Sequence, residues 1–160
     1  MRTVEQSLNE NKHALHSLVV FRRAANTITK SELETIKKYG LTVCQFGVME
    51  ALYNKGNLRI QDLIDKLLST SGNMTVVIKN MIRDGYIYKT IDTNDRRASL
   101  IALTPLGRET IEKILPEHYD RVGEIFSILS SEEQDQLAEI LKKFKNQQTQ
   151  DCQQKTNTIY

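Results

Sequence analysis

The sequence predicts a mainly α-helical protein: a winged helix-turn-helix with a two-stranded β-wing, embedded in a helical dimerisation frame. Apolar residues recur at helical spacing through most of the 160 residues. Between residues 86 and 103 the pattern changes to the alternation that is typical of strands. Tryptophan is absent and aromatic residues make up 6% of the chain. The core must therefore come from Leu, Ile, Val and Met, which suits helices better than a sandwich of sheets.

Two helices are predicted in the first third of the chain. Residues 5–38 contain neither proline nor glycine and are expected to form a long helix with at most one break. Thr42 and Gln45 have the spacing of a capping box, in which each side chain bonds the backbone of the other residue. A second helix is therefore expected to start there and to end at about Asn54.

A helix, a turn and a second helix follow. Residues 60–68 form a short amphipathic stretch, and the turn at 69–72 supplies N-caps for a helix from Ser71 to Arg83. This helix must direct one apolar stripe toward the core, consisting of Met74, Val77, Ile78, Met81 and Ile82.

A hairpin is predicted after this helix. Residues 86–91 and 98–103 have the composition of strands, and the turn at 93–97 between them is polar and basic. Helix-turn-helix followed by a two-stranded hairpin is the element order of a winged helix. It occupies residues 41–104, between an N-terminal dimerisation helix at 1–40 and C-terminal dimerisation helices at 105–146.

The C-terminal helices are delimited by their caps. Thr104 followed by Pro105 starts a helix, because proline suits the first helical position. Pro116 is expected to kink or interrupt it. Ser130 and Glu133 form another capping box, which starts the last helix. The segment 147–160, rich in Gln, Thr and Asn, is predicted to be a disordered tail.

Composition excludes several classes of protein. A net charge of +2 is too small for a binder that relies on a basic tail, so any DNA affinity must come from local placement of charge. No apolar run approaches the roughly 18 residues that a membrane span needs, and no signal-peptide core is present. Cys44 and Cys152 are too few for a disulfide framework. We therefore expect a cytoplasmic protein.

The helix 71–83 is predicted to read DNA. In a winged helix this element enters the major groove, and the hairpin tip reaches phosphates or the minor groove. We expect Asn73 to read adenine, Val76 and the Thr75 methyl group to contact thymine methyls, and Lys79 to reach guanine or phosphate. The alternative is an ordinary solvated helix face. The predicted DNA-binding residues are Ser71, Asn73, Thr75, Val76, Lys79, Asn80, Arg96 and Arg97.

The hairpin tip carries two adjacent arginines, Arg96 and Arg97, after Asp95. The carboxylate of Asp95 can hold one guanidinium in place while the other reaches DNA. A solvated turn is the alternative.

The same tip belongs to a longer pattern. Asp95-Arg96-Arg97, followed by Leu103-Thr104 and Gly107, matches D-x-R-x-x-x-x-x-L-T-x-x-G. This pattern and the segment Leu41–Phe46 resemble the multiple antibiotic resistance regulator (MarR) family, from about Arg22 to Phe144. The resemblance implies a triangular homodimer that docks two recognition helices in successive major grooves. It also implies a regulator, mostly a repressor, released by a small ligand or by cysteine oxidation.

The residues themselves also favour a homodimer. The first and last helices have apolar stripes that nothing else in the chain fully covers. Two-fold symmetry predicts a palindromic operator with half-sites about 10 base pairs apart. Double-stranded DNA, a second copy and a small-molecule effector are the expected partners, without a cofactor.

Two switching hypotheses remain open. The resemblance implies a ligand pocket between the dimer helices and the DNA-binding lobe, although Met and aromatic residues at such positions are more often plain core, and no ligand is assigned. Cys44 lies in the first turn of a helix, where the dipole favours a thiolate, although its spacing also fits a small core residue. Peroxide sensors of the family carry their cysteine near the start of the first helix, where this chain has none. The candidate pocket residues are His16, Val20, Phe46, Met49 and Tyr53.

The sequence favours neither a metal site nor an enzyme. His13, His16 and His118 allow a zinc-responsive variant, but solvated or interface histidines are favoured, and no metal site is assigned. The sequence has no phosphate loop, nucleophile elbow or H-E-x-x-H motif, so it does not predict an enzyme. A winged-helix protein-interaction module without DNA binding is the other alternative, which Lys79, Arg96 and Arg97 disfavour.

Overall fold

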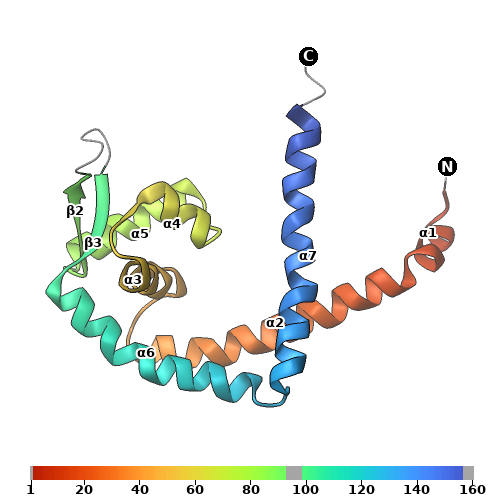
Figure 1. The fold of residues 1–160 in the computed structure, drawn as a ribbon, viewed down its shortest axis with the longest axis horizontal. Coiled ribbons are helices and arrows are strands. Elements are labelled where there is room, and N and C mark those ends of the chain that lie inside the picture. The colour runs from red at the N-terminus through yellow and green to blue at the C-terminus, as the bar shows by residue number, and fades with distance from the viewer. Residues whose placement is uncertain (1, 93–98, 157–160) are drawn as a thin grey trace. The chain divides into compact units, whose positions relative to one another are not determined.

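The computed structural model describes residues 2–92 and 99–156, with side chains described up to Phe144 (Figure 1). The chain divides into two compact units, residues 1–121 and 122–160. The predicted class, mainly helical with one small sheet, is confirmed. In chain order the elements are α1 (Val4–Glu10), α2 (Lys12–Lys38), α3 (Val43–Lys55), β1 (Leu58–Arg59), α4 (Ile60–Lys66), α5 (Ser71–Arg83), β2 (Ile87–Ile91), β3 (Ser99–Leu103), α6 (Pro105–Phe126) and α7 (Ser131–Thr156).

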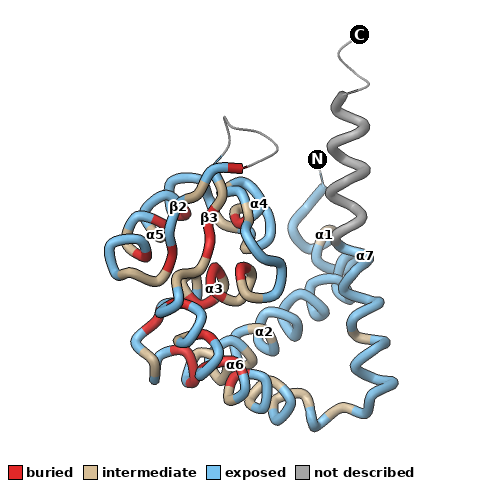
Figure 2. Tube along the Cα trace, turned by 60° about the vertical axis from the view of Figure 1, so that its left-hand side comes forward, coloured by how far each residue is buried: buried red, intermediate tan, exposed pale blue. Residues whose placement is uncertain are grey.

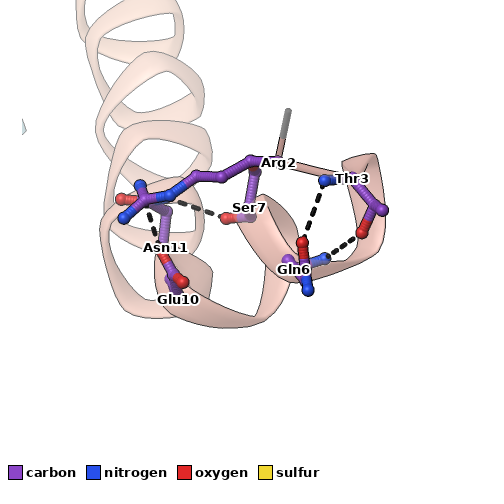
Figure 3. Close-up of polar contacts among 6 residues, drawn as sticks. All are labelled: Arg2, Thr3, Gln6, Ser7, Glu10 and Asn11. Atoms are coloured by element: carbon purple, nitrogen blue, oxygen red, sulfur yellow. Dashed lines mark hydrogen bonds and ion pairs between the residues drawn. The ribbon is translucent and has the colours of Figure 1, made fainter.

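The N-terminal helix is broken once, at Asn11, between α1 and α2 (Figure 3). Asn11 leaves helical geometry, and its side-chain amide donates to the carbonyl oxygen of Ser7 at 2.8 Å. A capping box between Thr3 and Gln6 starts α1. The break therefore falls at a residue type that prefers caps and turns to helix interiors.

The helix-turn-helix consists of α4, the turn after it, and α5. Upstream, α3 begins at the predicted capping box of Thr42 and Gln45. Thr70 caps α5, because its hydroxyl accepts the backbone N–H of Asn73 at 3.2 Å. The helix spans the predicted range and ends before Gly85, whose φ of 80° is readily adopted only by glycine.

The two strands of the wing, β2 and β3, belong to a three-stranded antiparallel sheet in the order β1–β3–β2. The predicted hairpin is confirmed, with Ile87 opposite Leu103 and Ile91 opposite Ser99. Strand β1 was not predicted. It contains two residues, too few to show a period, and it is defined only by its pairing with β3.

One apolar core fills the winged-helix lobe of the first unit (Figure 2). Met74, Ile78 and Met81 of the predicted α5 stripe are fully or almost fully buried. Val77 is half-buried, whereas Ile82 is 37% exposed and lies at the edge of the stripe. The predicted stripe is therefore confirmed over its central residues. No helix among residues 2–92 and 99–156 is long and apolar enough to cross a membrane.

Helix α6 continues through Pro116, so the predicted interruption at this residue is wrong. The side chains of Ile111, Ile114, Leu115 and His118 are buried on both sides of the proline. Packing of this continuous face against the core outweighs the loss of one backbone hydrogen bond.

In the second unit, α7 begins at the predicted capping box. The backbone N–H of Ser130 donates to Glu133 at 2.8 Å, and the N–H of Glu133 donates to the Ser130 hydroxyl at 3.3 Å. The backbone then stays helical to Thr156, so the start of the predicted disordered tail at residue 147 is not supported. Residues 157–160 lie outside the described part of the chain.

Candidate nucleic-acid interface

The face of α5 opposite the core is open to solvent. Ser71, Thr75 and Lys79 are exposed, Asn80 is half-buried, and Val76 is 57% exposed although it is apolar. Since the other side of α5 fills the core, this face has no packing role within the lobe. It offers the mixture of polar groups and methyl groups that base edges in a major groove can accept.

Lys79 supplies the free cation of this face. Its ammonium makes no hydrogen bond or ion pair with any described residue. Arg83, one turn later, is instead held by Asp84 at 2.9 Å. The Thr75 hydroxyl donates its proton to the carbonyl oxygen of Ser71 at 2.8 Å, so the methyl group and the lone pairs of the hydroxyl oxygen remain available to a ligand. The DNA contacts predicted for Thr75 and Lys79 stay predictions.

Asn73 is bound to the turn that precedes α5. Its side-chain amide donates to the Ser69 hydroxyl at 3.0 Å and to the sulfur of Cys44 in α3 at 4.0 Å. To read adenine as predicted, Asn73 would have to exchange these partners for the base. Sequence reasoning missed the contact with Cys44, because the two residues lie 29 positions apart in the chain.

The wing tip itself lies outside the described residues. Asp95, Arg96 and Arg97 all fall within 93–98, so their predicted roles stay predictions. The base of the wing is described. Asp92, only 8% exposed, accepts a hydrogen bond and ion pair from Arg59 of β1 at 2.7 Å.

This pair at the base of the wing was also missed by sequence reasoning. Arg59 occupies the N-cap position of α4, where Ser, Thr, Asp or Asn is usual. Its backbone N–H donates to Asp62 at 3.1 Å. An arginine at a cap position is the one local signal that its side chain binds a residue outside the helix end.

Comparison with known proteins agrees with this geometry. Residues 41–99 match the model of the MarR family. The HTH-type transcriptional regulator YkoM of Bacillus subtilis, itself described as uncharacterized, is 37% identical over 139 residues, which cover 86% of this chain and 90% of YkoM. The chain belongs to the MarR family. This family consists of DNA-binding transcription regulators and not of enzymes.

Two further proteins are similar over most of the chain. The HTH-type transcriptional regulator MhqR of Bacillus subtilis is 32% identical over 130 residues, covering 81% of this chain and 90% of MhqR. The solved structure of BpsR from Bordetella bronchiseptica superimposes with a TM-score of 0.70 at 26% identity, covering 79% of this chain and 90% of BpsR. The winged-helix fold of this MarR-family chain is therefore confirmed.

A cavity of about 630 Å³ adjoins the start of α5 in this MarR-family protein. We call it the α3–α5 cavity. Its walls come from α2, the first half of α3, the turn between α4 and α5, and the start of α5. The lining residues are Glu32, Val43, Cys44, Phe46, Gly47, Glu50, Leu67, Leu68, Ser69, Thr70 and Asn73.

Of the predicted pocket residues, only Phe46 lines this cavity. Met49 is fully buried in the core, and the ring of Tyr53 lies 5.4 Å from the guanidinium of Arg108. His16 and Val20 are exposed on α2. The structure does not bring the five residues together at the α3–α5 cavity.

Cys44 lies in the cavity wall, half-buried against the core. Desolvation raises the pKa of its thiol, and a hydrogen bond with Ser69 offsets this only in part. The expected stabilisation of a thiolate by the helix terminus is therefore not found. A raised pKa slows oxidation, so the structure gives the redox hypothesis no support.

The three histidines do not meet. His118 is buried in α6, its ring 4.5 Å from that of Phe46 and its Nε2 3.7 Å from a carboxylate oxygen of Glu32. His13 and His16 are exposed on α2. In the described part of the chain, no group of three or more His, Cys, Asp or Glu side chains could hold a metal ion.

Proposed function

We propose that this MarR-family chain is a homodimeric repressor that binds a palindromic operator and releases it when a small molecule binds. The observation that carries the proposal is the exposed outer face of α5, where Lys79 pairs with no described residue and Val76 exposes its methyl groups. Such a face can form both phosphate contacts and contacts to thymine, and the buried opposite face holds the helix rigidly.

Dimerisation is supported by apolar side chains that the chain leaves exposed. On α1 and α2 these side chains recur on successive turns, and more follow on α7. Isolated helices of this kind bury such stripes against a partner. The exposed apolar residues are Leu8, Leu15, Leu18, Val19 and Phe21 in the first unit, and Ile140, Leu141 and Phe144 in the second.

Release by a small molecule is supported by one relative and by the α3–α5 cavity. The structure of BpsR concerns regulation of its DNA binding by 6-hydroxynicotinic acid. In this chain, Thr70 and Asn73 belong both to the cavity wall and to the start of α5. A molecule in the cavity would therefore contact the end of the helix that meets DNA.

The test is selection of bound duplexes from a random pool, combined with sedimentation of the free protein. We expect a two-fold symmetric motif with half-sites about 10 base pairs apart, bound by a dimer. Absence of affinity for any duplex at low salt would contradict the proposal and favour the protein-interaction module.

Arg97→Ala is expected to weaken binding to the selected operator about tenfold or more, because one charge-assisted contact is lost from each half-site. The slope of log affinity against log salt should fall at the same time. Filter binding or fluorescence anisotropy at four salt concentrations measures both quantities. An unchanged slope would show that the wing does not contact phosphate.

Arg59 and Asp92 are expected to act as a unit in holding the base of the wing. In a double-mutant cycle with Arg59→Ala and Asp92→Ala, we expect a coupling free energy of about 0.5–3 kcal/mol, because the two charges are in direct contact at 2.7 Å and Asp92 is buried. Urea unfolding of the four proteins measures it. Strictly additive costs would show that the 2.7 Å contact contributes nothing.

A further inference from the structure

The α3–α5 cavity has a distinctive charge. Two carboxylates, Glu32 and Glu50, line it, whereas no Lys, Arg or His does. Both are half-buried. Glu50 makes no hydrogen bond or ion pair with any described residue, and Glu32 has only the 3.7 Å approach of His118. A half-buried carboxylate without a described protein partner stays open to water or to a cationic ligand.

The rest of the wall suits an apolar ligand body. Phe46 and Leu67 present an aromatic ring and a branched aliphatic side chain to the same space. A volume of about 630 Å³ falls within the range of small-molecule sites. The cavity thus combines apolar walls with negative charge, which attracts a cation and repels a carboxylate.

We propose that the α3–α5 cavity binds an organic amine in its protonated form, with its apolar body against Phe46 and Leu67 and its ammonium at the carboxylate of Glu50. The effect on DNA rests on the repressor function proposed above, but the binding itself does not. The proposal names the chemical class of the effector: an arylalkyl or alkyl ammonium ion, not an aromatic acid.

The position of the cavity also explains how binding of such an amine would affect the DNA-binding face. Thr70, the N-cap of α5, and Asn73, which is bound to Ser69, both line it. A ligand that displaces the Asn73–Ser69 contact changes the position of the first turn of α5. Because both ligands then depend on the same turn, amine and operator weaken the binding of one another.

Three probes of similar shape separate charge from size. Tyramine, 4-hydroxyphenylacetamide and 4-hydroxyphenylacetate share a phenol ring and a two-carbon arm, and carry charges of about +1, 0 and −1 at neutral pH. Cys44 reports occupancy, because it lies in the cavity wall. In full-length protein with Cys152→Ser, its alkylation by iodoacetamide is followed by mass spectrometry.

We expect tyramine to protect Cys44 at a concentration at least about tenfold lower than the acid requires, with the amide between them. In the Glu50→Gln variant, the three probes should protect Cys44 at similar concentrations. Glu5→Gln, on the exposed surface of α1, removes the same charge away from the cavity and should leave the order unchanged. Thermal unfolding of both variants checks that they are folded.

The proposal is overturned if 4-hydroxyphenylacetate protects Cys44 as well as tyramine does, or if millimolar tyramine gives no protection to the Cys152→Ser protein. A separate arm adds tyramine to the complex with the selected operator, where we expect release. Failure of the ligand-free protein to bind any duplex would refute the repressor function, while the protection series would still decide the ligand class.

Discussion

Gly107→Ala is expected to lower the free energy of unfolding by about 3 kcal/mol or more, at the upper end of the range for overpacked cores. Gly107 lies in α6 where the helix crosses the chain at Tyr86. A Cβ atom at this position would collide with the carbonyl oxygen of Tyr86 and lie 2.9 Å from its carbonyl carbon. Both are backbone atoms, so no side-chain rotation relieves the clash.

The same crossing point is fixed by hydrogen bonds. The Thr104 hydroxyl donates to the carbonyl oxygen of Gly85 at 2.6 Å and accepts the N–H of Gly107 at 3.0 Å. The backbone N–H of Thr104 donates to the carbonyl oxygen of Tyr86 at 3.0 Å. A displaced α6 would break these bonds, which join it to the chain that enters the wing.

The matched control is Gly72→Ala in α5, where a Cβ would meet nothing within 4 Å. We expect this variant to be more stable by about 0.4–1 kcal/mol, because alanine loses less backbone entropy in a helix. Urea unfolding without DNA, at one protein concentration, compares the two. Opposite signs are the expected result, and equal effects would contradict the steric argument.

Local signals explain which elements could be predicted from the sequence. The capping box of Thr42 and Gln45, the cap at Thr70 and the glycine at 85 each fix a helix end within a few residues. The alternation through β2 and β3 predicted their pairing. The glycine at position 107 was also predictable, since the wing pattern contains it. The structure adds the physical reason, because there is no space for a Cβ beside Tyr86.

The rest depends on contacts between distant segments. Periodicity shows that Phe46 and Met49 face inward, but not that one lines a cavity while the other is fully buried. The pairing of Arg59 with Asp92 and of Asn73 with Cys44 joins residues about 30 positions apart. Pro116 shows the converse, because tertiary packing of α6 overrides a local helix-breaking signal.

The candidate DNA face was predictable because it is the complement of the core stripe. Once Met74, Ile78 and Met81 are assigned to the interior, helical geometry places Lys79 and Val76 outside. Hydrogen bonding of the polar groups could not be predicted in this way. Among the described residues Lys79 has no partner, whereas Arg83 is held by Asp84, and sequence spacing does not reveal this difference.

Lys79→Glu is consequently expected to have the largest effect on DNA binding of any single change on α5. A side-chain contact to a base or phosphate is worth about 1–3 kcal/mol, and a dimer loses two of them. The reversed charge adds repulsion from phosphates. Operator affinity should therefore fall by about 30-fold or more, with a salt slope lower by about two per dimer if the contact is to phosphate.

The fold should survive this change, because Lys79 is exposed and touches no partner in the described part of the chain. Lys30→Glu provides the matched control: Lys30 is exposed on α2, far along the chain from α5, and its reversal changes the net charge equally. Fluorescence anisotropy with the selected operator compares the two variants. If they lose affinity equally, overall charge and not the α5 face governs binding; a loss confined to Lys79→Glu identifies α5 as the reading helix.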